Sequence, residues 1–198
     1  VYTCIASIPA IPSKPSMPFT LITVSRLVER KGHAHVLNAL AHLRGTGKLQ
    51  DFVYNIVGEG PMESSLMSMV ETLGLEDHVV FHGKVTDEER QKLYEQSHIF
   101  VMPVSQDMKD KEGFGLVYIE AAAAGVPSIA TRVDGVDEAV VDGQTGILLE
   151  SQDEQLLANA ILTLARDSSL REQLSVAAHE HAKTFTCQNQ MSKLDPYL

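Results

Sequence analysis

The stretch FTLITVSRLVERKGHAHVLNALAHLRGTGKLQDFVYNIVG, residues Phe19–Gly58, decides the fold class. Two short apolar runs, Phe19–Ser25 and Phe52–Gly58, flank the stretch Lys31–Arg44, whose apolar residues recur at helical spacing. Runs that are apolar on both faces are typical of strands in a parallel sheet that helices cover. The stretch therefore predicts a strand–helix–strand unit with a right-handed crossover.

The same alternation continues beyond Gly58. Four more apolar runs predict strands at His78–Gly83, His98–Pro103, Pro127–Arg132 and Gly146–Glu150. Amphipathic stretches predict helices at Met62–Leu73, Asp87–Gln96, Gly115–Ala124, Glu154–Ala165 and Leu170–Lys183. Thr86 and Glu89 form a capping box before the second of these helices. The sequence therefore predicts an α/β fold with a parallel sheet of about six strands and helices on both faces.

The chain of 198 residues is long enough for one α/β domain, and we divide it into three parts. Residues 1–18 are rich in proline and are predicted to be a linker from another domain, although a disordered chain end is an alternative. Residues 19–183 form the predicted domain, and residues 184–198 are assigned as a C-terminal tail.

Charge and cysteine content narrow the functional classes. The net charge of −10 argues against nucleic acid or an anionic membrane surface as a partner, because both require a basic stripe. No apolar run approaches the ~20 residues of a membrane-spanning helix, and we expect a cytoplasmic protein. Cys4 and Cys187 are expected to be unpaired thiols in a reducing cytosol, with a disulfide as the alternative.

Ligands of parallel sheets bind beyond the carboxyl ends of the strands, and the first two such loops carry suitable residues. In SRLVERKG, residues Ser25–Gly32, Arg26 and Lys31 offer donors to phosphate oxygens, although a solvated basic loop is the simpler interpretation. In VGEGP, Gly58 and Gly60 would let the backbone approach a ligand, although a plain turn explains them too.

The segment EGFGLVYIE, Glu112–Glu120, carries the most information about function. Glu112 lies before a predicted helix and Glu120 lies on its second turn, so each carboxylate could accept hydrogen bonds from two neighbouring hydroxyl groups. One could serve a hexose and the other a ribose, with the helix N-terminus between them for phosphate. Paired carboxylates would also suit glycoside hydrolysis, and two unrelated surface glutamates are the alternative without chemistry.

Four motifs in fixed order carry a resemblance to a known family. SRLVERKG, VGEGP, EGFGLVYIEAAAAGVP and VDGVDEAVVDGQTGILL resemble the C-terminal domain of the family-four glycosyltransferases, over roughly Phe19–Leu164. Members of that family are retaining enzymes with the GT-B fold of two Rossmann-like domains. The resemblance implies that this chain is the donor-binding half and that the N-terminal acceptor domain is absent from it, so the chain alone is expected to be inactive.

The resemblance also implies roles for individual residues. Arg26 and Lys31 would bind the diphosphate of a nucleoside-diphosphate sugar, Glu112 would lie against the transferred sugar, and Glu120 would hold the ribose hydroxyls. The other expected donor-binding residues are Gly58, Gly60, Gly83, Lys84, Val85, Gly113, Phe114, Gly115, Leu116 and Gly135, of which Gly83–Val85 would border the base. No cofactor and no catalytic metal are expected, because fixed cations and backbone dipoles stabilise the leaving diphosphate.

The chain departs from the family pattern at two positions, and other functions are compatible with the same fold. The family often has Gly-Gly where this chain has Asp134–Gly135, and an aromatic residue where Cys187 stands. A sugar-nucleotide 2-epimerase, a phosphorylase or a non-catalytic binding module could share the fold. The parent enzyme could reach a membrane through its other domain. Zinc at His33 and His35 is not expected, because residues two apart on a helix point to different faces.

Overall fold

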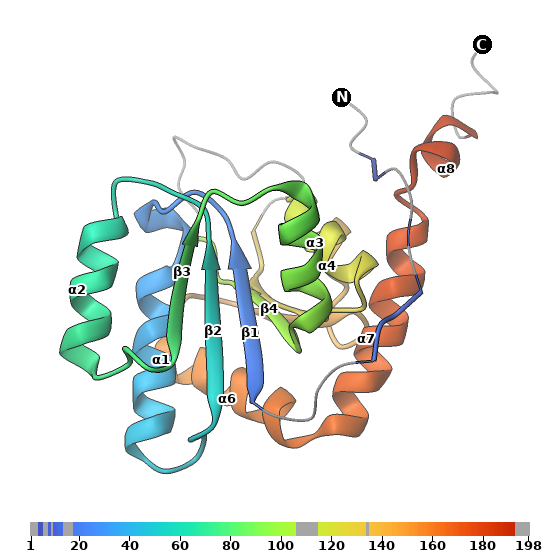
Figure 1. Ribbon diagram of the computed structural model, residues 1–198. Coiled ribbons are helices and arrows are strands. Elements are labelled where there is room, and N and C mark those ends of the chain that lie inside the picture. Colours follow the sequence, from blue (N-terminus) through green and yellow to red (C-terminus); the bar gives the residue numbers. More distant parts are fainter. Residues whose placement is uncertain are drawn as a thin grey trace.

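The computed structural model describes residues 4–5, 8, 10–13, 18–105, 115–133 and 135–192, and these residues form one parallel sheet with helices on both sides (Figure 1). The strands are β1 (Phe19–Val24), β2 (Phe52–Val57), β3 (Val79–Gly83), β4 (Ile99–Met102), β5 (Ser128–Thr131) and β6 (Gly146–Leu149). Their order across the sheet is β3-β2-β1-β4-β5-β6, and every neighbouring pair is parallel. The predicted fold class is confirmed, and each strand begins and ends within one residue of the range predicted for it.

Helices bury one apolar core on each face of the sheet. The first core lies under α1 (His33–Gly45), α2 (Glu63–Leu73) and α6 (Glu154–Arg166). The second lies under α3 (Asp87–Gln96), α4 (Leu116–Ala123) and α5 (Val136–Ala139). Helix α7 (Ser168–Lys183) contributes Leu174 to the first core and Ala178 to the second. In the described part of the chain, no helix has the length and apolar character needed to cross a membrane.

Local signals explain where most helices begin and end. Thr86 accepts a hydrogen bond from the Glu89 backbone while the Glu89 side chain accepts one from the Thr86 backbone, so the predicted capping box of α3 is confirmed. The predicted helix Lys31–Arg44 is divided at Gly32, which has φ +76° and separates the 3₁₀ turn η1 (Glu29–Lys31) from α1. Helix α5 and the terminal helix α8 (Cys187–Ser192) were not predicted, because stretches of four and six residues show little periodicity.

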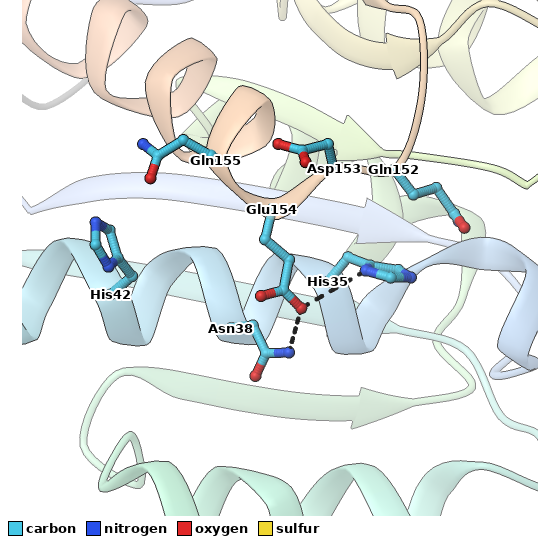
Figure 2. Close-up of a pocket in the computed structure, with 7 residues that line it drawn as sticks. All are labelled: His35, Asn38, His42, Gln152, Asp153, Glu154 and Gln155. Carbon is cyan, nitrogen blue, oxygen red and sulfur yellow. Dashed lines mark hydrogen bonds and ion pairs between the residues drawn. The ribbon is translucent and has the colours of Figure 1, made fainter.

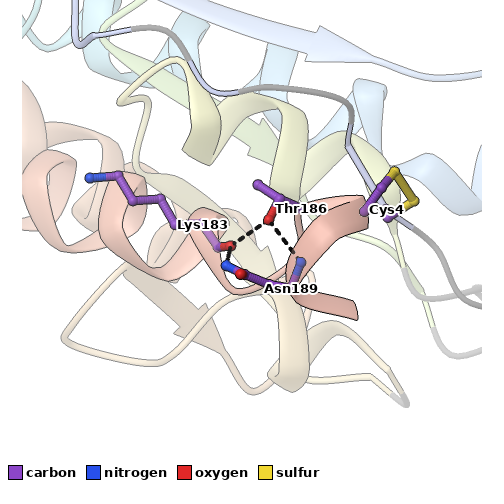
Figure 3. The surroundings of a disulfide bond; sticks show 5 residues. Cys4, Lys183, Thr186 and Asn189 are labelled. Carbon is purple, nitrogen blue, oxygen red and sulfur yellow. Dashed lines mark hydrogen bonds between the residues drawn. A yellow bond between two sulfur atoms is a disulfide. The ribbon is translucent and has the colours of Figure 1, made fainter. Parts of the chain in front are cut away.

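The two ends of the described chain are joined. Ile5 donates a backbone hydrogen bond to Phe185 (3.0 Å) and accepts one from Cys187 (3.1 Å), and Cys4 forms a disulfide with Cys187 (Figure 3). The expectation of two unpaired thiols was therefore wrong. Ile5 and Ile8 pack against the second core, and this packing brings Cys4 beside a residue 183 positions away. The assignment of residues 1–18 as a linker from another domain stays a prediction.

Candidate functional site

The loops that leave β1, β2 and β3 are joined to one another at the carboxyl edge of the sheet. Leu27 donates a backbone hydrogen bond to Glu59 (2.9 Å), and Gly58 donates one to Gly83 (2.8 Å). The side chain of Leu27 is fully buried and anchors the first loop in the core. Three of the segments that sequence analysis proposed for donor binding therefore lie side by side.

Gly58 and Gly60 are accounted for by close approach of the first loop. A Cβ atom at Gly58, where φ is +126°, would lie 2.0 Å from the carbonyl oxygen of Ser25. A Cβ atom at Gly60 would lie 2.4 Å from the carbonyl oxygen of Leu27. Neither position can hold a larger residue without moving backbone. The two glycines let the backbone of the first loop pass close to the loop after β2. Direct contact of these glycines with a donor stays a prediction.

The two basic residues of the first loop differ in burial. Arg26 is exposed, whereas Lys31 is 9% exposed at the end of η1. His33, at the start of α1, is buried, and its Nε2 atom lies 3.2 Å from the Oγ atom of Ser25. Burial, and to a smaller extent the charge of Lys31, lowers the pKa of His33 to about 4. The first loop therefore packs, through Ser25, on a buried and neutral histidine.

The first loop also contacts the segment that follows β4. Ser105 donates a backbone hydrogen bond to Arg30 (2.8 Å), and a Cβ atom at Gly32 would lie 2.2 Å from the carbonyl oxygen of Pro103. Strands β1 and β4 are neighbours, yet the chain continues from β1 towards β2 and from β4 towards β5. Such a reversal of strand order opens the crevice in which open α/β sheets bind ligands. The loop of Arg26 and Lys31 lies at this crevice.

Three of the predicted site residues, Glu112, Gly113 and Phe114, lie outside the described residues, as does Asp134, which departs from the family pattern. Gly115 precedes α4 with φ +68°, and a Cβ atom there would lie 2.6 Å from the ring of Tyr118. Leu116 is the first residue of α4. Gly135 precedes α5, in the loop that follows β5. Gly115 and Leu116 therefore lie at the start of α4, where helix geometry favours an anion. Gly135 precedes a helix of four residues whose first N–H, that of Val136, already donates to Val133.

Glu120 lies on the second turn of α4 and faces α3. Its Oε2 atom is 3.3 Å from Nε of Arg90 and accepts a hydrogen bond from the hydroxyl of Tyr94 (3.2 Å). The side chain is 20% exposed, and this burial raises the pKa of Glu120, while Arg90 and the Tyr94 hydrogen bond oppose the rise. Arg90 and Tyr94 were not among the predicted site residues. Their spacing of four residues, which places both on one side of α3, was the available signal.

A hollow of about 410 Å³ opens beside Lys84 and Val85, on another side of α3. His82 and Leu93 also line this hollow, and Nε2 of His82 lies 2.8 Å from Oδ1 of Asn55. The hollow therefore lies where the chain leaves β3 and enters α3. That Gly83–Val85 border the base of the donor stays a prediction.

A second hollow, of about 520 Å³, lies on the seam between α1 and the start of α6 (Figure 2). Glu154 lies between two residues of α1: it accepts a hydrogen bond from Asn38 (2.5 Å) and is 3.8 Å from Nδ1 of His35. None of the residues proposed for donor binding lines it. Among the residues that the structure describes, no group of three or more His, Cys, Asp or Glu side chains could hold a metal ion.

Three features define a Rossmann-like domain of the nucleotide-binding class. They are the strand order, the loop of Arg26 and Lys31 where that order reverses, and the carboxylate of Glu120 on α4. The profile of the family described as "Glycosyl transferases group 1" matches residues 5–181, and the chain belongs to this family. The resemblance noted in the sequence is thereby confirmed.

Two similar proteins illustrate the range of the family. The chain is 35% identical over 164 residues to a GDP-mannose-dependent alpha-(1-6)-phosphatidylinositol monomannoside mannosyltransferase of Mycolicibacterium smegmatis, covering 82% of this chain and 42% of that protein. It is 33% identical over 177 residues to a D-inositol 3-phosphate glycosyltransferase of Corynebacterium diphtheriae, covering 87% of this chain and 40% of that protein. The chain thus spans about two fifths of the length of these relatives.

Solved structures agree with this assignment. The C-terminal domain of the group 1 family protein LpcC from Francisella tularensis superimposes with a TM-score of 0.74 at 26% identity, covering 86% of this chain and 87% of that one. The pneumococcal O-GlcNAc transferase GtfA in complex with UDP and GlcNAc has a TM-score of 0.82 at 25% identity, covering 98% of this chain and 38% of that one. The fold is that of the C-terminal domain of a GT-B enzyme.

Proposed function

We propose that this chain is the donor-binding half of a retaining glycosyltransferase that moves a hexose from a nucleoside-diphosphate sugar to a hydroxyl acceptor in glycan or polysaccharide biosynthesis. The observation that carries the proposal is the junction at the carboxyl edge of the sheet. There the loop of Arg26 and Lys31 contacts the loop after β2 and the segment after β4. The GDP-mannose and UDP in the names of related proteins support a nucleotide-sugar donor.

The residues divide the donor between them. Arg26 and Lys31 bind the diphosphate, and the start of α4 adds backbone N–H groups. Glu120 accepts hydrogen bonds from the ribose, and Glu112 lies against the transferred sugar. Each group meets a part of the donor that matches its charge or hydrogen-bonding capacity.

The chemistry requires stabilisation of a leaving group. The bond between the anomeric carbon and the diphosphate breaks, a bond to the acceptor oxygen forms on the same face of the sugar, and the proton of the acceptor hydroxyl passes to the departing diphosphate or to water. Negative charge grows on the departing diphosphate, and fixed cations that are already in place are worth several kcal/mol there. In this proposal Arg26 and Lys31 supply that charge without a catalytic metal.

The acceptor belongs to the other half of the enzyme. A domain preceding this chain would supply the opposite wall of the cleft, and the reaction would take place in the cytoplasm. The chain by itself is then expected to bind donor but to transfer little sugar.

Titration calorimetry with UDP, GDP, ADP and their sugar derivatives tests the donor site. We expect one base to bind best, and we expect Arg26→Ala and Glu120→Ala each to weaken binding by on the order of tenfold, as for loss of a hydrogen bond to a charged group. Arg166→Ala is the matched control, because Arg166 is exposed and, among the described residues, donates a side-chain hydrogen bond to the carbonyl of Lys48, away from the site. Undiminished binding by both site variants would remove the assigned site.

The reaction itself is tested with the full-length enzyme. Radiolabelled donor and product analysis distinguish transfer to an acceptor from epimerisation of the free sugar nucleotide. The anomeric configuration of the product, read by NMR, must match that of the donor; an inverted product would contradict the proposed retention.

A further inference from the structure

Arg90 holds the carboxylate of Glu120 through two of its nitrogens. Nε of Arg90 lies 3.3 Å from Oε2, and Nη2 lies 3.5 Å from Oε1. The guanidinium therefore faces both oxygens with its planar fork, an arrangement that fixes the orientation of a carboxylate as well as its charge. Asp87 lies on the other side of the same guanidinium, 3.0 Å from Nη1, and is 92% exposed.

Tyr94 is the second support of Glu120. Its side chain is buried at 1% exposure, with the ring 6.2 Å from that of Phe100 on β4. Its hydroxyl lies 3.2 Å from Oε2 of Glu120 and 3.4 Å from the backbone oxygen of Val117. A buried ring has few alternative positions, so this hydroxyl stays within hydrogen-bond distance of the carboxylate, which is the nearer of its two acceptors.

Among the described residues, these contacts leave part of the acceptor capacity of the carboxylate unused. An ionised carboxylate has about four acceptor positions, two on each oxygen. Among the described residues, Oε1 accepts a hydrogen bond from Arg90 and Oε2 accepts one from Tyr94, while Nε of Arg90 lies at ion-pair distance from Oε2. Each oxygen therefore keeps an acceptor position that a hydroxyl group of a ligand can use.

We propose that Arg90 and Tyr94 are positioning residues for the donor, and that by fixing Glu120 they make the site select a ribonucleotide over its deoxy analogue. The inference rests on the proposed function, in which Glu120 meets the ribose. It adds α3 to the donor site, because the same helix lines the hollow beside Val85 through Leu93.

The test is a set of affinities for matched nucleotides. The nucleoside diphosphate whose base binds best is compared with its 2′-deoxy and 3′-deoxy analogues by titration calorimetry. The wild-type chain is expected to prefer the ribonucleotide over at least one analogue by on the order of tenfold, the value of a hydrogen bond to a charged acceptor. In Arg90→Ala this preference is expected to fall to about twofold or less, with partial recovery in Arg90→Lys.

Two further variants separate positioning from folding. Tyr94→Phe keeps the buried ring and removes only the hydroxyl, so it is expected to reduce the preference for the ribonucleotide while the unfolding transition remains cooperative. Asp87→Asn removes the other partner of Arg90 and should leave the preference intact. Arg166→Ala is again the control for loss of an arginine elsewhere.

The pH dependence provides a readout that a purely structural role would not change. The charged and titratable groups that bear on Glu120 in the described residues are Arg90, Tyr94 and Asp87, all on α3. Arg90 opposes the rise that burial causes in the pKa of Glu120, so Arg90→Ala should move the loss of nucleotide affinity on acidification to higher pH. An unchanged midpoint in this variant would contradict the inference.

The outcomes also distinguish this inference from the function on which it rests. If the wild-type chain does not discriminate between the ribonucleotide and either deoxy analogue, the assignment of Glu120 to the ribose fails. If the wild-type chain discriminates and both Arg90→Ala and Tyr94→Phe do so equally well, the donor site stands and the positioning role is overturned.

Discussion

The buried imidazole of His33 contacts the loop of Arg26 and Lys31, with its Nε2 atom 3.2 Å from the Oγ atom of Ser25. Ser25 is the first residue after β1 and His33 is the first residue of α1, so this contact joins the two ends of the loop. Nδ1 of His33 is buried and has no hydrogen-bond partner among the described residues. A proton added to this ring would therefore bring an unpaired charge into the core.

The free energy of unfolding is expected to fall on acidification because of His33. Its pKa is about 4 in the folded chain, against 6.5 for an unperturbed histidine, so the unfolded state binds the proton first. The stabilisation is complete above pH 6.5 and is lost as the pH falls towards 4, about 3 kcal/mol in total. Urea unfolding at several pH values should show a shallower dependence in His33→Gln, and equal slopes for both proteins would contradict the assignment.

Gly60→Ala is expected to destabilise the chain by about 1–3 kcal/mol, because the new methyl group would overlap the carbonyl of Leu27. The first loop must then move, so nucleotide affinity should fall as well. Gly45→Ala is the control: a Cβ atom at this last residue of α1 meets nothing within 4 Å, and the change should be neutral or slightly stabilising. Equal melting temperatures for the two variants would contradict this prediction and would show that the first loop can move without loss of stability.

Reduction of the Cys4–Cys187 disulfide is expected to lower the free energy of unfolding by about 2–5 kcal/mol, because the bond closes a long loop in the unfolded chain. Denaturation with and without dithiothreitol measures the effect. Cys187→Ser should be as unstable as the reduced protein and insensitive to the reductant. Because reducing compartments disfavour such a bond, trapping of free thiols in intact cells would also test the predicted cytoplasmic location.

Nucleotide binding is expected to be independent of divalent metal. The described residues contain no group of three or more carboxylate, histidine or cysteine side chains that could hold an ion, and the proposed diphosphate ligands are cationic side chains. The affinity for the best nucleoside diphosphate should therefore change less than about twofold between excess EDTA and excess magnesium chloride. A strict requirement for magnesium would assign charge neutralisation to the ion instead of to Arg26 and Lys31.

The fold could be predicted from the sequence because its signals are local. Strands that are buried on both faces, such as Phe19–Val24, consist of continuous apolar runs, and Thr86 with Glu89 marks the start of α3. The disulfide was missed because the contact between Ile5 and the end of α7 depends on packing of distant segments. No local pattern around Cys4 records that contact.

The site was predicted in its loops but not in its supporting residues. The loop of Arg26 and Lys31 follows a strand, so strand order alone places it at the carboxyl edge. Arg90 and Tyr94 lie on a helix that precedes β4, and their four-residue spacing indicates a shared face without indicating that this face contacts Glu120. The roles of Arg26, Lys31, Glu112 and Glu120 towards a donor stay predictions until binding is measured.

The bond between Cys4 and Cys187 also determines how the domain carries mechanical load. Both cysteines lie outside the sheet, one before β1 and the other after α7, so every strand lies within the covalent ring that they close. Tension applied at residues beyond the two cysteines passes through the sulfur atoms and does not reach the six strands. The segment between Cys4 and Cys187 would therefore resist stretching until the bond is reduced.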